Sequence, residues 1–316
     1  MAKYYLVTGG AGFIGSHIAE RLLGEGQQVR IVDDLSTGKR ETVTGLEDRY
    51  PGRLDFHHGD LAEPEVCQRA VQGVTHIFHQ AALASVPRSL ADPLATNRAN
   101  VTGTLNLLLA ARDAGVERLV YAGSSSVYGE NPELPKVETM PPAPLSPYAL
   151  SKYVGEEYAR LFAEHFNVAT VTLRYFNVFG PRQDPDSPYA AVIPIFMRRL
   201  LRGEPPVIHG DGEQSRDFTF IANVVDANLA ACHTPGAHGA YNIACGGRTT
   251  VNALLANLQA LLGLDIPPRH EAPRPGDVPH SYADIGRAQR ELGYRPRVDF
   301  DEGLAETVAY FRQQLA

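Results

Sequence analysis

The sequence has few cysteines, no long apolar run and no excess of positive charge. Its three cysteines, Cys67, Cys232 and Cys245, are odd in number, far apart and outside any CxxC pair, so neither a disulfide framework nor a structural zinc site is expected. We interpret them as small buried residues in a reducing compartment. No apolar run approaches the roughly 18 residues of a membrane helix, and the N-terminus lacks the regions of a signal peptide. These absences predict a cytoplasmic protein without a membrane partner.

The charge balance is acidic, with 36 Asp and Glu against 29 Lys and Arg and a net charge of −7. A negative surface repels phosphate backbones, so no nucleic-acid partner is expected. The eleven histidines do not indicate a metal site. His76 and His79 fall on one predicted strand and would point to opposite faces, and the neighbours His57 and His58 diverge likewise. No metal site is predicted.

The order of predicted strands and helices indicates an α/β fold. Short β-rich runs alternate with helix-length stretches whose apolar residues recur every three or four positions. The predicted strands span residues 4–8, 29–33, 54–57, 76–79, 119–122 and 170–175, and the clearest helices between them span 14–23 and 104–114. This alternation predicts a doubly wound parallel sheet of the Rossmann type with helices on both faces.

The second half of the chain differs in character, because proline-rich connections separate shorter elements after about residue 180. Helices are expected at 192–202, 223–231, 251–262 and 302–314. We predict that residues 1–180 form the Rossmann lobe and that 181–316 form a smaller mixed α/β lobe, with interdigitating segments. A chain of 316 residues is compatible with one large domain or two. Ligand is expected in the cleft at the carboxyl ends of the strands.

A glycine-rich segment, Thr8–Gly15, follows the first predicted strand at once and opens a helix. Glycines there permit a tight turn and bring the backbone close to a pyrophosphate, while the helix N-terminus offers N–H donors to phosphate. Asp33 lies eighteen residues beyond Gly15 at the end of the second predicted strand, where a carboxylate accepts hydrogen bonds from ribose hydroxyls. No arginine follows at once to neutralise a 2′-phosphate, so NAD is favoured over NADP.

A tyrosine and a lysine, Tyr148 and Lys152, are four residues apart and share one face of a predicted helix. A fixed cation beside a phenol lowers its pKa from about 10 and makes it a usable base. On spacing alone the two could be ordinary surface residues. The serines in 124–126 end the preceding strand, where polar side chains project into the crevice of the sheet; they could also cap a helix or satisfy a loop.

Several motifs in order resemble the extended short-chain dehydrogenase/reductase family, and most of all its UDP-hexose 4-epimerases, especially those acting on UDP-N-acetylglucosamine. The similarity runs from Tyr5 to about Tyr294. Its motifs are Thr8–Gly15, Asp33, Gly59–Leu61, His79–Ala82, Ser124–Gly129, Tyr148 with Lys152, and Arg174–Asn177.

The resemblance implies that Ser124, Tyr148 and Lys152 are catalytic. Tyr148 removes the proton of the sugar 4-hydroxyl, Ser124 hydrogen-bonds that hydroxyl, and Lys152 holds the nicotinamide ribose. Hydride passes from C4 to bound NAD, and the 4-keto sugar turns and takes it back on its other face. The implied NAD contacts are Gly9, Gly12, Phe13, Ile14, Gly15, Asp33, Leu35, Ser36, Thr37, Gly38, Asp60, Leu61, Gln80, Ala81, Ala82, Asn100, Tyr148, Lys152 and Phe176.

The resemblance also implies a UDP-sugar substrate. Arg216 and Arg274 would hold the diphosphate and ribose, and Asp277 would accept from ribose hydroxyls. Ser281 stands where glucose/galactose-restricted relatives have a Tyr, so it leaves room for an acetamido group. The full set of implied substrate contacts is Ser85, Ser124, Ser126, Tyr148, Asn177, Ala191, Val192, Phe196, Arg216, Arg274, Asp277 and Ser281.

The neighbours of Ser124 distinguish among related reactions. Similar 4,6-dehydratases have Asp-Glu where this chain has Ser125 and Ser126, because loss of water needs a second base and acid. The resemblance therefore favours reversible inversion at C4. The alternatives are a UDP-sugar 4,6-dehydratase, a UDP-glucuronate-type epimerase or decarboxylase, and an idle NAD or nucleotide-sugar sensor. Relatives also imply a homodimer, in which the helices around 104–114 and 148–162 form a four-helix bundle.

Overall fold

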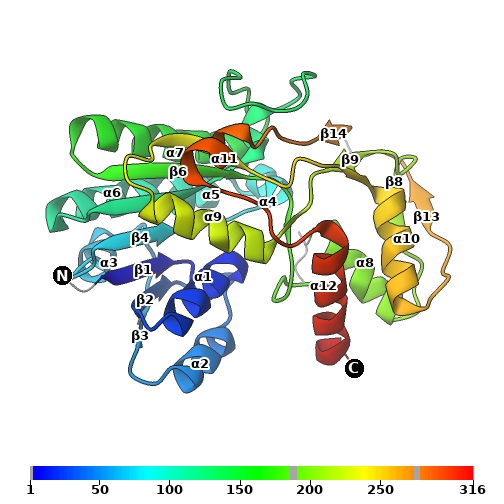
Figure 1. Cartoon of the computed structure of the whole chain (residues 1–316), viewed down its shortest axis with the longest axis horizontal. Helices are drawn as coiled ribbons and strands as arrows, with labels where there is room; N and C mark the ends of the chain where they lie inside the picture. The colour runs from blue at the N-terminus through cyan, green and yellow to red at the C-terminus, as the bar shows by residue number, and fades with distance from the viewer. Residues whose placement is uncertain (1–2, 186–190, 274–277, 316) are drawn as a thin grey trace.

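A computed structural model describes residues 3–185, 191–273 and 278–315 of the chain (Figure 1). Its centre is a seven-stranded sheet in the order β11-β6-β5-β4-β1-β2-β3, in which every neighbouring pair is parallel. The strands are β1 (Tyr4–Thr8), β2 (Gln28–Asp33), β3 (Leu54–His58), β4 (His76–His79), β5 (Arg118–Ser124), β6 (Ala169–Tyr175) and β11 (Gly239–Ile243). The predicted α/β fold with a parallel sheet is confirmed.

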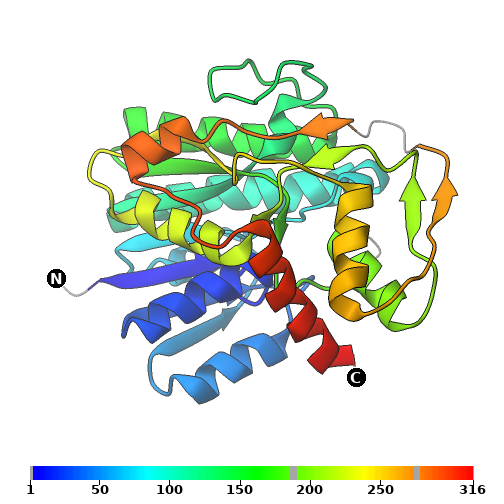
Figure 2. The same ribbon diagram turned by 45° about the vertical axis from the view of Figure 1, so that its right-hand side comes forward.

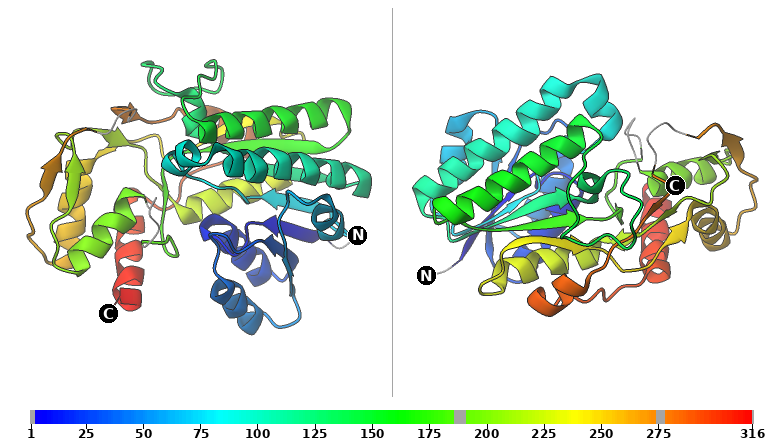
Figure 3. Two further views of the ribbon diagram at one scale, coloured as in Figure 1. Left: turned by 180° about the vertical axis from the view of Figure 1, so that it is seen from behind. Right: turned by 90° about the horizontal axis from the view of Figure 1, so that it is seen from above.

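Helices cover both faces of this sheet (Figure 3). One face carries α1 (Phe13–Gly24), α2 (Arg40–Arg49), α9 (Ile221–His233) and α11 (Gly286–Leu292), and the other carries α3 (Pro64–Ala70), α6 (Gly103–Ala114) and α7 (Pro147–His165). Successive strand residues alternate between the two faces. Leu6 and Ile77 are therefore buried in one apolar cluster, whereas Val7 and Phe78 are buried in the other.

A smaller lobe stands beyond the carboxyl ends of the strands (Figures 1 and 2). Its helices are α8 (Val192–Leu201), α10 (Val251–Leu262) and α12 (Phe300–Leu315). Its short strands are β7 (Val178–Phe179), β8 (Val207–His209), β9 (Ser215–Arg216), β10 (Thr219–Phe220), β12 (Thr249–Thr250), β13 (Arg269–Glu271) and β14 (His280–Ser281). They pair as β10-β7, β12-β9-β14 and β13-β8. The predicted mixed α/β character of this lobe is confirmed.

The two halves of the chain are interleaved. After building β7–β10 in the smaller lobe, the chain returns as α9 and then as β11, which pairs with β6 at the edge of the main sheet. The sequence did not predict β11. A division at residue 180 stays a prediction, and 221–243 pack with the first lobe.

Short helices connect the strands near the cleft. These are α4 (Val86–Ala91), α5 (Pro93–Asn97), a π-helical turn (Arg98–Thr102) and a 3-10 turn, η2 (Ser125–Tyr128). None of the helices within the described ranges is both long and apolar enough to cross a bilayer. All three cysteines are free, but only Cys67 and Cys232 are buried. The expectation of burial is wrong for Cys245, which is partly exposed near the end of β11.

Candidate active site

The glycine-rich segment forms a tight turn between β1 and α1. Gly9 has a φ of +67°, and its amide donates to the Val32 carbonyl at 2.8 Å. A Cβ on Gly9 would stand 2.7 Å from the Ala81 amide nitrogen, and one on Gly15 would stand 2.2 Å from the Gly9 carbonyl oxygen. Side chains are therefore excluded from both positions. Gly12 caps α1 without a side-chain hydrogen bond, which leaves the amides of the first helical turn available to an anion.

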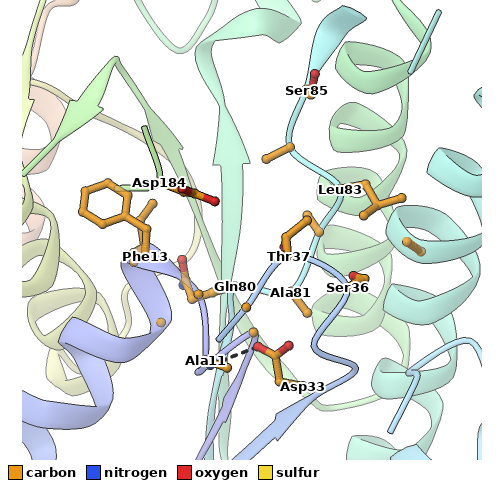
Figure 4. Close-up of a pocket in the computed structure, with 18 of the residues that line it drawn as sticks. Ala11, Phe13, Asp33, Ser36, Thr37, Gln80, Ala81, Leu83, Ser85 and Asp184 are labelled. Carbon is orange, nitrogen blue, oxygen red and sulfur yellow. Dashed lines mark hydrogen bonds between the residues drawn. The ribbon is translucent and has the colours of Figure 1, made fainter. Parts of the chain in front are cut away.

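Asp33 ends β2 beside this turn (Figure 4). One carboxylate oxygen accepts the Ala11 amide at 3.0 Å and the other accepts the Leu35 amide at 2.9 Å. Burial raises the pKa of Asp33, and these two donors act in the opposite direction. The side chain is thus fixed with its remaining lone pairs at the wall of the cavity, which suits the ribose hydroxyls of a dinucleotide.

One cavity of about 1050 Å³ runs from this turn to the end of β5. Figure 4 shows Phe13, Gln80 and Asp184 on one side of it and Thr37, Leu83 and Ser85 on the other. Most predicted NAD contacts line it, namely Gly9, Gly12, Phe13, Ile14, Gly15, Asp33, Leu35, Ser36, Thr37, Gly38, Asp60, Leu61, Gln80, Ala81, Ala82 and Tyr148. The predicted substrate contacts that line it are Ser85, Ser124, Ser126, Tyr148, Asn177 and Ala191.

Seven predicted site residues do not line this cavity: Asn100, Lys152, Phe176, Val192, Phe196, Arg216 and Ser281. Phe176 and Phe196 are buried in the main apolar cluster. Asn100 lies behind the wall, where it bonds both the amide and the carbonyl of Leu83 and donates to the Ser151 hydroxyl at 2.9 Å. It thereby fixes the Leu83–Ser85 wall to α7. Arg274 and Asp277 lie outside the described residues.

The three predicted catalytic residues come from the ends of β5 and α7. Ser124 ends β5, and its hydroxyl accepts the Ser126 amide at 3.2 Å and lies 2.8 Å from the Ser126 hydroxyl. Tyr148 is the second residue of α7, which begins after the Ser146 cap. The Ser124 hydroxyl lies near enough to the Tyr148 phenol to lower its pKa. The structure thus brings the phenol and two hydroxyls together at one end of the cavity.

Burial, rather than Lys152, dominates the pKa of Tyr148. Desolvation raises the pKa of this phenol, and the hydrogen bond with Ser124 lowers it. The net shift is therefore opposite to the lowering expected from Lys152, which is not among its causes. The Lys152 ammonium instead donates to the Ala122 carbonyl at 2.9 Å and lies 5.2 Å from the centroid of the Tyr121 ring. Burial lowers the pKa of Lys152 to about 8.

Arg216 and Ser281 are cross-strand partners, because β9 pairs with β14 in parallel register. The residue after Arg216, Asp217, is 1% exposed and holds this region together. Its carboxylate accepts the amides of Cys245, Gly246 and Ala283 at 2.9, 3.0 and 3.4 Å. Burial raises the pKa of Asp217 to about 6. The sequence indicated Arg216 and Ser281 but not the buried Asp217 carboxylate that follows β9.

The cavity wall includes charged residues that sequence reasoning missed: Lys39, Arg88, Arg182 and Asp184. Lys39 and Asp184 form an ion pair at 3.6 Å, and Arg182 pairs with Glu20 of α1. These contacts join segments more than 140 residues apart, so no local motif marks them. Within the described ranges, no three His, Cys, Asp or Glu side chains gather in a way that could hold a metal ion.

The glycine turn, the fixed acid and the Ser–Tyr pair fit the pattern of one large enzyme family, and a sequence profile decides the matter. The profile of the NAD dependent epimerase/dehydratase family matches residues 5–244. The chain belongs to this family. NAD is the family's cofactor, so the cofactor prediction is confirmed. The glycine turn has no room for side chains at Gly9 and Gly15, and the Asp33 carboxylate is fixed beside it. These residues therefore fit NAD.

Similar proteins within the family include several sugar-nucleotide epimerases. UDP-glucose 4-epimerase of Mycolicibacterium smegmatis is 38% identical over 311 residues, which is 98% of each chain. The solved UDP-N-acetylglucosamine 4-epimerase of Methanobrevibacter ruminantium is 41% identical with a TM-score of 0.94 and 99% of each chain covered. The solved UDP-glucose 4-epimerase of Thermotoga maritima, in complex with UDP-glucose, is 40% identical with a TM-score of 0.94. The match covers 99% of this chain and 100% of that one.

Proposed function

We propose that this chain is a UDP-hexose 4-epimerase that accepts N-acetylated as well as plain hexoses. The observation that carries the proposal is a single cavity of an NAD-dependent family, in which the glycine turn lies at one end and the Tyr148 phenol and Ser124 hydroxyl lie together at the end of β5. The names of the similar proteins support it, since they include epimerases of UDP-glucose and of UDP-N-acetylglucosamine.

In this proposal the residues of the chain bind, orient and move one proton. Bound NAD supplies a reversible acceptor of hydride next to the sugar. Tyr148 accepts the proton of the 4-hydroxyl and returns it after the ring has turned, and Ser124 holds that hydroxyl by a hydrogen bond. Lys152 would contact the nicotinamide ribose, and Arg216 the diphosphate. Asp33 would accept hydrogen bonds from the adenosine ribose, and the first amides of α1 would bind the pyrophosphate.

The serines after Ser124 argue against the related eliminations. Ser125 and Ser126 line the cavity beside Ser124, and neither side chain can remove a C5 proton or protonate a leaving hydroxyl at neutral pH. A 4,6-dehydratase or decarboxylase would need a titratable group there. The presence of Tyr148 and Ser124 together in the wall of one cavity in turn supports an enzyme over an idle nucleotide-sugar sensor.

The test is to incubate the purified protein with UDP-N-acetylglucosamine, UDP-glucose and UDP-glucuronate separately and to follow the anomeric proton signals. Formation of the 4-epimer without loss of water or CO2 supports the proposal. A 4-keto-6-deoxy product or a pentose overturns it in favour of a dehydratase or a decarboxylase. Unchanged substrate in all three tubes supports the sensor.

Ser281 carries the prediction about the sugar. Replacing it in the Ser281→Tyr variant should lower kcat/KM for UDP-N-acetylglucosamine by about tenfold or more relative to UDP-glucose, because a ring beside the C2 substituent excludes the acetamido group. Both rates are measured by the same NMR assay. The matched control is Ser281→Ala, which leaves the space open and should keep the wild-type ratio. An unchanged ratio in Ser281→Tyr contradicts this assignment.

We also propose that the protein is a homodimer. Helices α6 and α7 lie side by side on one face (Figure 3), and Leu94 of α5 and Leu150 of α7 are 81% and 50% exposed there. A second copy would cover such leucines in a four-helix bundle.

Leu94→Asp should convert the dimer to a monomer, because it places a charge in the apolar interface. The mass is measured by light scattering during gel filtration. Leu261→Asp on α10 is the control, since Leu261 is also exposed but lies in the other lobe, and it should leave the dimer intact. A monomeric wild-type protein, or a dimeric Leu94→Asp variant, contradicts the proposal.

A further inference from the structure

Behind the catalytic end of the cavity lies a buried polar network centred on Arg174 of β6. Arg174 is 4% exposed. Its guanidinium donates to both carboxylate oxygens of Glu156, from Nε at 3.0 Å and from Nη2 at 2.5 Å. Its third nitrogen, Nη1, donates to the Tyr128 hydroxyl at 2.8 Å. Nη1 also donates to the Glu138 carbonyl at 3.4 Å. One rigid cation therefore bonds Glu156 on one side and Tyr128 on the other.

The two side-chain partners of Arg174, Glu156 and Tyr128, belong to the two elements that carry the catalytic side chains. Glu156 lies on α7, one helical turn after Lys152 and eight residues after Tyr148, so all three share the face toward the sheet. Tyr128 ends η2, the 3-10 turn that Ser124 caps. Arg174 itself pairs across the sheet with Gly123, the residue before Ser124.

The far side of the network is also anchored. The Tyr128 hydroxyl donates to the Asn242 side-chain oxygen at 2.7 Å, and the Asn242 amide group donates to the Lys136 carbonyl at 2.9 Å. The Arg174 guanidinium carbon also lies 4.9 Å from the centroid of the Tyr128 ring. The aromatic ring is thus held by its hydroxyl and by its face, and η2 cannot slide along β6 without breaking these bonds.

We infer that Glu156, Arg174 and Tyr128 are positioning residues that set the separation of the Tyr148 phenol from the Ser124 hydroxyl. None of them lines the cavity, and their side chains bond one another and Asn242. Their hydrogen bonds join α7 to η2 through the planar guanidinium of Arg174. A shift of either element would break one of these bonds, because the guanidinium is rigid. The inference rests on the proposed function for its kinetic consequence, but not for its structural one.

Tyr128→Phe is the mildest test, because it removes one hydroxyl and keeps the buried ring. It should lower kcat about tenfold, since small misplacements of reacting groups are costly, while KM and the content of bound NAD stay within about twofold. It should also move the pH limb that reports Tyr148 to higher pH, because the Ser124 hydrogen bond that lowers this pKa is weakened. Arg174→Lys should give the same losses, since an ammonium cannot span both partners, and the double variant should be no worse than either single one.

Tyr241→Phe is the matched control. Tyr241 also has a fully buried ring, and its hydroxyl donates to the exposed Glu291 carboxylate at 2.8 Å, so each variant keeps its buried ring and loses one tyrosine hydroxyl bond. This control variant should have a lowered Tm and an unchanged kcat. Wild-type kcat and pH profile in Tyr128→Phe, even with a lowered Tm, overturn the inference, and so does a loss confined to KM.

A readout without turnover separates the two proposals. The ionisation of Tyr148 is followed by ultraviolet titration, as the difference between each protein and its Tyr148→Phe derivative. The Tyr128→Phe variant should show the Tyr148 transition at higher pH than wild type. An unmoved transition overturns the positioning role, whereas a moved transition in a protein without epimerase activity overturns only the proposed function.

Discussion

Replacing Tyr148 with phenylalanine is expected to lower kcat for UDP-glucose by about 10³-fold, the scale of a lost general acid–base group. Phe keeps the ring that lines the cavity, so NAD content and the Tm should stay near wild type. Without the hydroxyl, the nearby Ser124, Ser125 and Ser126 are neutral at working pH. The other phenol of this wall, Tyr175, is already hydrogen-bonded to Gln80 and Asn228, and burial raises its pKa. The rate is measured by NMR at saturating substrate.

The control for this variant is Tyr158→Phe. Tyr158 lies on the same helix and packs partly buried against the other apolar cluster, so it reports the cost of losing any tyrosine hydroxyl from α7. It should turn over within about twofold of wild type, like most substitutions away from a site. If Tyr148→Phe retained a large part of the wild-type kcat, another group would have to move the proton and the assignment of Tyr148 as base would be wrong.

The main sheet could be predicted from the sequence because its inner strands are short apolar runs that alternate with amphipathic helices. The structure begins β1 and ends it where the sequence predicted, at Tyr4 and Thr8. The sequence prediction failed for β11. Its five residues, Gly239–Ile243, include a glycine and an alanine and show no strong β pattern. What makes this segment a strand is the free edge of β6 beside it.

The site was predictable where its chemistry is local. The glycine turn, Asp33 and the serines of η2 each lie within a few residues of a strand end, where sequence order fixes position. Contacts between distant segments were not predictable, such as Lys39 with Asp184 across the cavity. Glu156 and Arg174 likewise meet only because α7 packs on β6.

The pKa of Tyr148 shows a limit of a different kind. The four-residue spacing correctly places Tyr148 and Lys152 on one helix face. The spacing does not predict which group the Lys152 ammonium will bond. In the structure its partner is the Ala122 carbonyl. Desolvation is felt by the phenol wherever the cation lies, so burial decides the direction of the shift.

The second large effect is expected at the glycine turn, from Gly15→Ala. A methyl group there would stand 2.2 Å from the Gly9 carbonyl oxygen and 2.8 Å from its carbon, and both atoms belong to the backbone turn that we propose binds the pyrophosphate. The backbone of the turn must move apart to make room for the methyl group, and this changes the orientation of the amide N–H groups at the start of α1. Bound NAD should fall by about 100-fold or more, since several charge-assisted hydrogen bonds to phosphate weaken together. NAD is measured by extraction from the purified protein and by titration of the depleted protein.

Gly45→Ala is the matched control, because a Cβ on Gly45 in α2 meets no atom within 4 Å. That substitution should leave NAD binding unchanged and raise stability by about 1 kcal/mol, the difference in helix propensity between the two residues. Gly15→Ala should instead lower the Tm, as overpacking does. Far-ultraviolet circular dichroism shows whether it still folds, so that a loss of NAD in a folded protein is assigned to the turn. Full NAD content in folded Gly15→Ala would mean that the pyrophosphate does not sit on this turn.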